Sequence, residues 1–498
     1  MRTSLVSESP RAKRLGVEMR SILILPGLSF ALFGCGEGEL RASSGDVEAL
    51  DTGSLDAGPD AGPDAGPDAG PDAGPDAGPD AGPDAGPDAG PDAGPDAAPD
   101  AAPEGPIVYP NDRHHAPITE EIAASLRALA GRRTDVFAKV GDSITVSSSS
   151  LHCFASDRVD LADHEALSET LDLFRGGAAG ETTPFDRSSL SATSGWSVGR
   201  AVEGEPSPVE AEVAAIDPRF AVIMFGTNDI QNRSFDTYAT GMRTLVDGLL
   251  AEGVIPLLST VPARRDNADA DAEVAAYNAA VRGLAQSRLV PFMDYHLMLR
   301  DVPNGGLGGD GIHPNSYATP AGVRPCVFTE AGLQFGYNVR NLLTLESLDR
   351  VRRALQGPAV PDASAPRRFG EGTAASPILI AGTPALPFAD VVDTRLDGES
   401  RHSRYACHPE ADEGGHEVVY QLELEAPAVV RARVADGPGV DIDLHLLADP
   451  DDAASCLDRD DRDLTASLEA GTWYLVLDTY VQAGMVLPGE VVFVVTAE

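Results

Sequence analysis

Basic residues and cysteines are scarce in this chain of 498 residues. It has 37 Lys and Arg against 78 Asp and Glu, which gives a net charge of −41. That charge argues against nucleic acid as a partner, because phosphates demand a basic protein face. It argues equally against electrostatic adhesion to anionic lipid. The Cys and His residues also lack the spacing of a zinc site, so we expect no cofactor and no catalytic metal.

The apolar stretch at residues 22–33 is too short for a committed transmembrane span. Basic residues precede it and Gly34-Cys35 follows it, which is the pattern of a secretory signal. Leu-Phe-Gly-Cys at 32–35 resembles the bacterial lipoprotein box, in which the cysteine becomes a lipidated N-terminus. We therefore predict a lipoprotein-type signal peptide over residues 1–35 and a lipid anchor on Cys35. The protein would then be exported and held at the bacterial cell envelope, at the outer membrane or cell surface. A cleaved signal without lipid is the alternative.

Residues 56–103 consist of ten Asp-Ala-Gly-Pro units followed by two Asp-Ala-Ala-Pro units. Proline at every fourth position blocks both helix and sheet, and repulsion between the Asp side chains keeps the chain extended. We predict a disordered linker over residues 36–105. A calcium-binding repeat is the rival interpretation, but isolated Asp residues at this spacing do not form a convergent oxygen cage.

Residues 106–355 alternate short buried strands with longer helical patterns. The predicted strands are 136–141, 220–225, 254–260 and 289–294, and the predicted helices are 118–130, 208–216, 235–252, 270–286, 329–345 and 346–355. Such alternation predicts an α/β domain whose parallel sheet carries helices on both faces.

The pattern changes after residues 356–373, which are rich in Pro, Ala and Gly and predict a second linker. In residues 374–498 the apolar period becomes two, as where Ile442, Leu444 and Leu446 alternate with polar residues. Short strands at regular spacing predict an all-β sandwich domain.

Four motifs of the α/β domain stand in a fixed order: Gly-Asp-Ser-Ile at 141–144, Gly195, Gly-Thr-Asn-Asp at 226–229, and Asp-Gly-Ile-His at 310–313. Two of them directly follow predicted strands, and reactive groups collect at the carboxyl ends of strands in open α/β sheets. In order and spacing this set resembles the SGNH (GDSL-type) esterase and lipase family over roughly residues 130–345. The resemblance implies a three-layer α/β/α sandwich, flavodoxin-like, and a carboxylic ester hydrolase activity.

The resemblance implies that Ser143 is the nucleophile, His313 the general base and Asp310 the residue that orients His313. A serine hydroxyl is a poor nucleophile until a base takes its proton, and a His oriented by Asp is the usual solution. The offset of three residues lets one loop deliver both Asp310 and His313.

The resemblance also implies an oxyanion hole made by the backbone N–H groups of Ser143 and Gly195 and by the side-chain amide of Asn228. A glycine at 195 would permit a close backbone approach. Asp142 and Asp229 are interpreted as structural hydrogen-bonding partners.

A rival nucleophile lies in the same region. Gly-Trp-Ser-Val-Gly at 195–199 matches the Gly-x-Ser-x-Gly elbow of α/β-hydrolases and would make Ser197 the nucleophile. That elbow needs a long helix directly after it, but Gly204 and Pro206 would cut such a helix short.

With Cys35 in the anchor, four cysteines remain in an oxidising compartment. We predict disulfides Cys153–Cys326 and Cys407–Cys456, because pairing within domains lets each domain fold alone. Buried free thiols are the alternative.

The C-terminal domain resembles bacterial pre-peptidase C-terminal β-sandwich modules through the segments 440–446 and 471–478. Its acidic surplus offers weak calcium binding through Asp441, Asp443 or Asp478, although a solvated acidic face explains the same residues. His114 and His115 offer a metal pair, or a solvated loop.

The sequence as a whole predicts a secreted or lipid-anchored serine esterase that forms an acyl-Ser143 intermediate. Its partner would be an ester substrate, either a lipid or an O-acylated carbohydrate, and the membrane would be met only through the anchor. A non-catalytic surface-binding protein and an acyltransferase with the same triad are the alternatives.

Overall fold

The structure, a computed structural model, describes residues 105–357, 359–380 and 385–497. These residues all belong to one compact unit, Ala93–Glu498. Within them, no helix has both the length and the apolar character that crossing a membrane requires. The predicted signal peptide, the lipidation site Cys35 and the Asp-Ala-Gly-Pro repeats lie outside the described residues.

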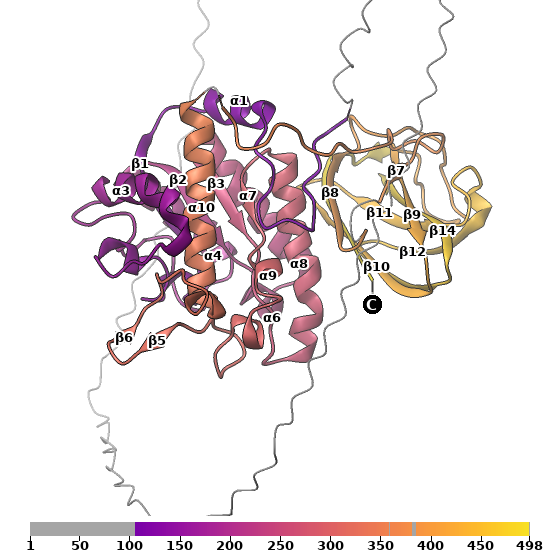
Figure 1. The fold of residues 1–498 in the computed structure, drawn as a ribbon. Helices are drawn as coiled ribbons and strands as arrows, with labels where there is room; N and C mark the ends of the chain where they lie inside the picture. Colours follow the sequence, from indigo (N-terminus) through magenta and orange to yellow (C-terminus); the bar gives the residue numbers. More distant parts are fainter. Residues whose placement is uncertain (1–104, 358, 381–384, 498) are drawn as a thin grey trace, which may run out of the picture. The chain divides into compact units, whose positions relative to one another are not determined.

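A parallel sheet of four strands, in the order β1-β2-β3-β4, organises the α/β domain (Figure 1). Its strands are β1 (Arg133–Gly141), β2 (Pro218–Met224), β3 (Ile255–Ser259) and β4 (Phe292–Met293). Every residue of β2 and β3 is buried, as expected where helices cover both faces of a parallel sheet.

Helices α3 and α10 cover one face of this sheet, and α5, α7 and α8 cover the other (Figure 1). The α-helices are α1 (Glu120–Ala128), α2 (Ser143–Val146), α3 (Ser168–Gly176), α4 (Gly199–Val202), α5 (Pro208–Ile216), α6 (Asp229–Asn232), α7 (Phe235–Ala251), α8 (Ala268–Ser287), α9 (Tyr295–Met298) and α10 (Gly336–Gln356). Short 3₁₀ turns are η1 (His152–Ala155), η2 (Ala162–Leu167), η3 (Pro303–Gly306) and η4 (Gly332–Gln334), and β5 (Ala318–Thr319) pairs with β6 (Gly322–Val323). The three layers confirm the predicted α/β fold class.

Two elements differ from the sequence-based expectation. The two closing helices predicted at 329–345 and 346–355 are wrong, because one helix, α10, runs unbroken from Gly336 to Gln356. It begins at Gly336, where the chain passes so close to Gly306 that a side chain would strike the backbone carbonyl of Gly306. The strand predicted at 289–294 is confined to β4, because Asp294 caps α9 by accepting a hydrogen bond from the N–H of Leu297 (2.9 Å).

The C-terminal region is a β sandwich, as predicted, and its strands pair antiparallel except for β7 and β9, which are parallel. One sheet has the order β13-β10-β17-β8 and the other β12-β11-β14-β9-β7. Their strands are β7 (Ile378–Leu379), β8 (Phe388–Asp393), β9 (Glu417–Leu424), β10 (Ala428–Asp436), β11 (Ile442–Leu447), β12 (Cys456–Asp460), β13 (Asp463–Leu468), β14 (Gly471–Thr479) and β17 (Glu490–Ala497), with a 3₁₀ turn η5 (Ala453–Ser455) and a small hairpin of β15 (Val481–Gln482) and β16 (Met485–Val486). Apolar side chains of both sheets, among them Val434 and Phe493 from one and Leu444 and Leu477 from the other, meet in one buried core.

The sandwich packs directly on the α/β domain through α8, which contacts β8 and β17. A side chain at Gly283 of α8 would approach the Cβ of Ala389 to 3.0 Å, so the helix and the sheet lie close together. Arg288, which follows α8 directly, forms bonds of 2.7 Å to both Asp247 and Glu490, the latter in β17. The whole chain, rather than an excised domain, is therefore the suitable form for experiments.

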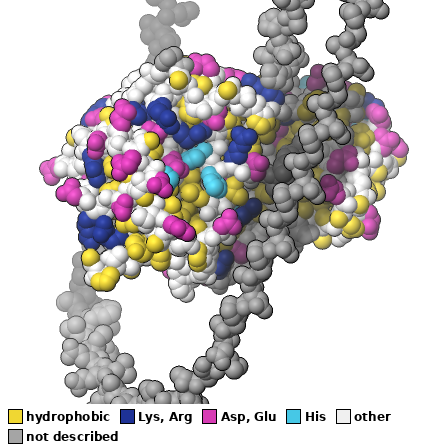
Figure 2. Space-filling model, in the orientation of Figure 1, with side chains coloured by type: hydrophobic (Ala, Val, Ile, Leu, Met, Phe, Trp, Pro, Cys, Tyr) yellow, Lys and Arg dark blue, Asp and Glu magenta, His cyan; other side chains and the backbone are white. Residues whose placement is uncertain are grey.

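On the face shown in Figure 2, acidic and basic side chains are interspersed over the α/β domain. This agrees with the sequence, where 12 Asp lie in residues 56–103 and 25 acidic residues in 369–498. The excess negative charge thus belongs mainly to segments outside the α/β domain.

Candidate active site

Ser143 lies at the carboxyl end of β1, on the first turn of the short helix α2. Asp142 caps this helix, since its Oδ1 accepts a hydrogen bond of 2.9 Å from the N–H of Ile144. Gly141 must lack a side chain, because a Cβ there would lie 2.7 Å from the carbonyl oxygen of Met224. The end of the buried strand and the cap together fix the direction of the Ser143 hydroxyl.

His313 and Asp310 reach Ser143 from a loop late in the domain. The Oγ of Ser143 lies 2.8 Å from His313 Nε2, and His313 Nδ1 lies 2.7 Å from Asp310 Oδ2. Asp310 Oδ1 also accepts hydrogen bonds of 3.0 Å from the N–H groups of Ile312 and His313, which folds the loop back on itself. Partial burial raises the pKa of Asp310, but the hydrogen bonds from His313 and Ile312 outweigh it and lower the pKa to about 2. A carboxylate is thus always available to His313 at neutral pH.

Asn228 lies beside Asp142 at the carboxyl end of β2. Its Nδ2 donates to the carbonyl oxygen of Trp196 (3.0 Å) and to Asp142 Oδ2 (3.3 Å). Gly195 has φ +80°, in the left-handed region that favours glycine, whereas a Cβ there would meet no protein atom within 4 Å. In this fold a glycine is favoured at position 195 by its backbone angle, and not by close contact with other protein atoms.

Asp229 joins two of the motif segments. Its Oδ1 accepts from the N–H of Val198 (2.9 Å) and its Oδ2 from the N–H of Gly226 (3.2 Å). Burial raises the pKa of both Asp229 and Asp142 to about 6. Both carboxyl groups are fully buried, and both accept hydrogen bonds from backbone N–H groups around Ser143. These contacts are those of structural hydrogen-bonding partners.

Ser197 occupies a different position. The helix that follows it, α4, has four residues, far from the long helix that a nucleophile elbow requires. Ser197 is buried, and the hydroxyl that contacts His313 Nε2 belongs to Ser143. The geometry therefore favours Ser143 over Ser197.

Two residues of α10 belong to this framework and carry no sequence signal. Arg340 is buried under α2, where its guanidinium donates to the carbonyl oxygen of Ile144 (3.4 Å), to Thr145 Oγ1 (3.2 Å) and to Ser150 Oγ. Burial lowers its pKa, and the nearby charge of Asp142 opposes that shift. No motif marks a buried arginine or asparagine on a long helix, so sequence analysis missed both Arg340 and Asn341.

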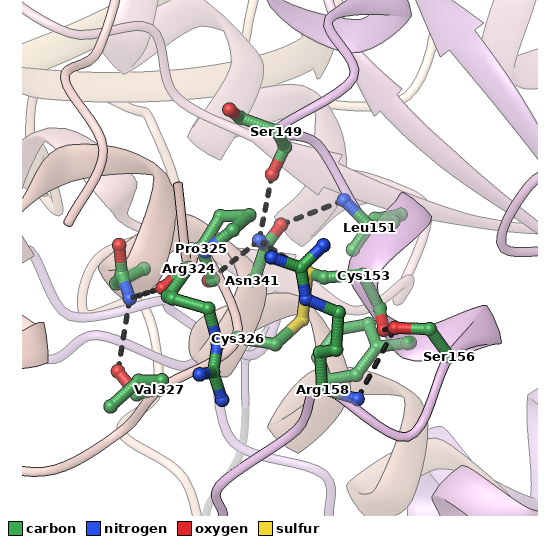
Figure 3. The surroundings of a disulfide bond; sticks show 12 residues. Ser149, Leu151, Cys153, Ser156, Arg158, Arg324, Pro325, Cys326, Val327 and Asn341 are labelled. Carbon is green, nitrogen blue, oxygen red and sulfur yellow. Dashed lines mark hydrogen bonds between the residues drawn. A yellow bond between two sulfur atoms is a disulfide. The ribbon is translucent and has the colours of Figure 1, made fainter. Parts of the chain in front are cut away.

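The disulfide Cys153–Cys326 joins the segment after Ser143 to the segment after His313, as predicted (Figure 3). Asn341 reinforces the junction by donating to the carbonyl oxygens of Ser149 (2.9 Å) and Pro325 (3.0 Å). The second predicted disulfide, Cys407–Cys456, lies in the β sandwich.

The residues considered for metal binding have other contacts. Cys407 and Cys456 lie near His445, but both sulfurs are in the disulfide and offer no thiolate.

The acidic residues considered for calcium also have other contacts. Asp443 pairs with Arg459 (2.6 Å), and Asp478 accepts from the hydroxyl of Tyr405 (2.7 Å). Asp441 lines an open polar cavity. Within the described ranges, no three carboxylates bring their oxygens together in one metal-sized group.

The two histidines at the start of the domain do not form a pair of ligands either. His115 bonds to Glu346 (3.1 Å) and Ser347 (3.1 Å) instead, and His114 is exposed.

Ser143, His313 and Asp310 thus form one hydrogen-bonded series at the carboxyl end of β1. Residues 139–318 match the GDSL-like Lipase/Acylhydrolase family, so this part of the chain is an ester-bond hydrolase domain. A search of curated proteins finds no match.

Solved structures similar to this chain include three esterases and lipases. A GDSL-like lipase from Bacteroides thetaiotaomicron is 16% identical with a TM-score of 0.28, over 46% of this chain and 96% of that one. A psychrotrophic esterase from Pseudoalteromonas sp. is 12% identical with a TM-score of 0.29, over 43% and 97%. An acetylxylan esterase from Geobacillus stearothermophilus is 17% identical with a TM-score of 0.30, over 45% and 96%.

Proposed function

We propose that this protein is an exported, lipid-anchored serine esterase that hydrolyses carboxylic esters through an acyl-Ser143 intermediate. The hydrogen-bonded series from Ser143 Oγ through His313 to Asp310 carries the proposal, since its two distances are 2.8 and 2.7 Å. The GDSL-like match over residues 139–318 supports the same reaction class.

In the first half of the reaction, His313 Nε2 takes the proton of Ser143 as the hydroxyl attacks the ester carbonyl carbon. His313 then gives this proton to the leaving alkoxide, and the acyl group stays on Ser143. In the second half, His313 takes a proton from water, the hydroxide attacks the acyl carbon, and Ser143 leaves with the proton. Asp310 holds the imidazole orientation and stabilises its charged form.

The oxyanion formed in each half needs donors near Ser143. We assign this role to the N–H groups of Ser143 and Gly195 and to the amide of Asn228. The bond from Asn228 to Trp196 holds the amide in one plane, next to the residue that precedes Ser143. When the oxyanion forms, Asn228 Nδ2 would donate to it in place of its longer, 3.3 Å hydrogen bond to Asp142.

Exposure of the site favours hydrolysis over acyl transfer. The side chains of His313 and Asp310 are 40% and 52% exposed, so water reaches the base directly. An acyltransferase benefits from a closed site that excludes water, because water would compete for the acyl-enzyme.

Export and anchoring are supported by the signal pattern before Cys35 and by the two disulfides, which persist in oxidising compartments. Metabolic labelling with a tagged fatty acid tests the anchor. We expect label on the wild type and none on Cys35→Ser, while equal labelling of both would contradict the anchor.

A panel of 4-nitrophenyl esters of increasing acyl length, applied to the folded full chain, tests the proposed activity. We expect turnover of the short acyl esters. Absence of turnover with every acyl length would contradict the esterase and favour a non-catalytic binding protein.

A further inference from the structure

A cavity of about 340 Å³ lies between the segment that follows Ser143 and the segment that follows His313. Serine hydroxyls, His152 and two guanidinium groups line it, and no acidic side chain does. In a chain with twice as many acidic as basic residues, a cavity with this lining is unusual.

The cavity begins next to the proposed active site. The two segments touch first where Ser143 contacts His313. They touch again a few residues further along, where Ser316 Oγ donates a hydrogen bond to Ser149 Oγ (2.9 Å). Ser149 lines the cavity. Because the chain between Ser143 and Ser149 begins with the compact turn of α2, the part of the cavity wall at Ser149 lies on the order of 10 Å from Ser143. That distance suits a group of the substrate several bonds away from the ester.

The walls of the cavity are held rigidly. The disulfide Cys153–Cys326 joins them, and both cysteines lie in or beside the lining segments. Figure 3 shows Asn341 between these segments, where it donates to Ser149 and accepts from the N–H of Leu151 (2.9 Å). A rigid, preformed site loses little conformational freedom on binding.

The two guanidinium groups, Arg158 and Arg324, have no acidic partner among the described residues. Arg158 donates to the carbonyl oxygen of Ala321 (3.3 Å). The Nε of Arg324 is buried without a hydrogen-bond partner, and in the described part of the chain no ion pair involves its guanidinium. Figure 3 shows both side chains beside the disulfide. Arg187, by contrast, binds Glu212 through two nitrogens (2.7 and 2.9 Å).

A further cation lies behind the cavity wall. Lys139 Nζ is 3.4 Å from His152 Nε2. Burial, together with the charge of Lys139, lowers the pKa of His152 to about 4, so His152 is neutral at pH 7. The nearby charge of Asp186 acts on both Lys139 and His152 and offsets the charge of Lys139. The positive charge of the cavity lining therefore comes from Arg158 and Arg324, with His152 as a neutral hydrogen-bonding group.

We propose that this cavity binds an anionic group, a carboxylate or phosphate, on the alcohol part of the ester substrate. This proposal rests on the proposed esterase function, and it names esters of acidic carbohydrates as the substrate class. Guanidinium groups match the oxygen geometry of both anions and form charge-assisted hydrogen bonds with them.

Matched ester pairs test this specificity. Acetylated oligogalacturonate is compared with the same oligomers after methyl esterification, which removes the charge and keeps the acetyl groups. Acetylated glucose 6-phosphate against acetylated glucose forms the phosphate pair. Where the cavity fits the anion of a pair, we expect kcat/KM for the charged ester to exceed kcat/KM for the uncharged ester of the same pair by roughly 10- to 100-fold. That factor corresponds to one or two charge-assisted hydrogen bonds.

The variant Arg158→Gln/Arg324→Gln should bring this ratio close to one, and Arg324→Lys should keep part of it. The neutral ester of each pair is the reference, so a general effect on the active site cancels in the ratio. Arg353→Gln is the matched control, because Arg353 is 59% exposed and pairs with Asp349 on α10, and the ratio should stay at the wild-type value.

Wild-type turnover of 4-nitrophenyl acetate without preference for either charged ester would overturn the pocket assignment alone. So would a preference that survives in the double variant. No turnover of 4-nitrophenyl acetate would instead overturn the esterase function on which the assignment rests.

Discussion

Replacing Asp310 with Asn should impair hydrolysis more than replacing it with Ala. The reason lies in how the loop uses the two carboxylate oxygens. Oδ1 accepts from the N–H groups of Ile312 and His313, and Oδ2 lies 2.7 Å from His313 Nδ1. After Asp310→Asn, only the amide oxygen can accept from the backbone, so the amide NH₂ group would face Nδ1. His313 would then carry its proton on Nε2, where it cannot accept the proton of Ser143.

The magnitudes follow from exposure. Charges about 4 Å apart attract by about 1 kcal/mol in water and about 4 kcal/mol at an effective dielectric constant near 20. Because His313 and Asp310 are 40% and 52% exposed, a value of roughly 2–3 kcal/mol is reasonable, which predicts a loss of about 30- to 150-fold for Asp310→Ala. Asp310→Asn adds the wrong tautomer, and its loss should approach the ~10⁴-fold seen when a triad carboxylate becomes an amide.

The assay is kcat/KM on 4-nitrophenyl acetate, with circular dichroism to show that each variant is folded. Added formate should restore part of the activity of Asp310→Ala, because the space is open to solvent, and none of the activity of Asp310→Asn. Asp112→Ala is the control, since Asp112 has the same offset to His115 and lies on the surface. An Asn variant as active as the Ala variant would refute this account of the loop.

Three further changes test the framework. Asn228→Ala should lower kcat by roughly 10²–10³ with little change in KM, and a change confined to KM would assign Asn228 to substrate contact instead. Burial raises the pKa of Asp229 from 3.8 to about 6, so this group favours the folded state below pH 4 and loses that contribution as pH rises through 6. In Asp229→Asn, the fall in unfolding free energy between pH 4 and 7 should therefore be smaller by about 2 kcal/mol, measured by urea unfolding, and an unchanged fall would contradict the shift. Arg340→Met should lower kcat roughly 10- to 100-fold by releasing α2. Arg219 is a buried arginine that bonds to the backbone carbonyls of Leu126 and Gly253, away from the active site, so Arg219→Met should lower stability and leave kcat unchanged. Equal effects on kcat would show that Arg340 is only structural.

Strong apolar periodicity explains which elements the sequence predicted well. The helix at 208–216 has the bounds of α5, and its capping box, with Ser207 and Glu210 bonded to each other's backbone, gives a local signal for its start. The short apolar run at 136–141 predicted the strand before Ser143, and these six residues are the buried part of β1. Both signals are local, so tertiary contacts do not alter them.

Helix α10 shows why the rest could not be predicted. It buries Asn338, Arg340 and Asn341, whose polar groups bond to loops from distant parts of the chain. Buried polar residues weaken the apolar pattern that marks a helix face, so the periodicity did not place the start of the helix at Gly336. The same contacts position Ser143 and the cavity beside it, and a sequence pattern does not reveal which distant loop a polar residue meets.

Labelling of the nucleophile tests the central claim most directly. A 4-nitrophenyl phosphonate ester modifies an activated serine covalently, and peptide mapping by mass spectrometry identifies the residue. We expect one adduct per chain, on Ser143, which persists in Ser197→Ala and is absent, together with all esterase turnover, in Ser143→Ala. An adduct on Ser197, or full turnover by Ser143→Ala, would contradict the account.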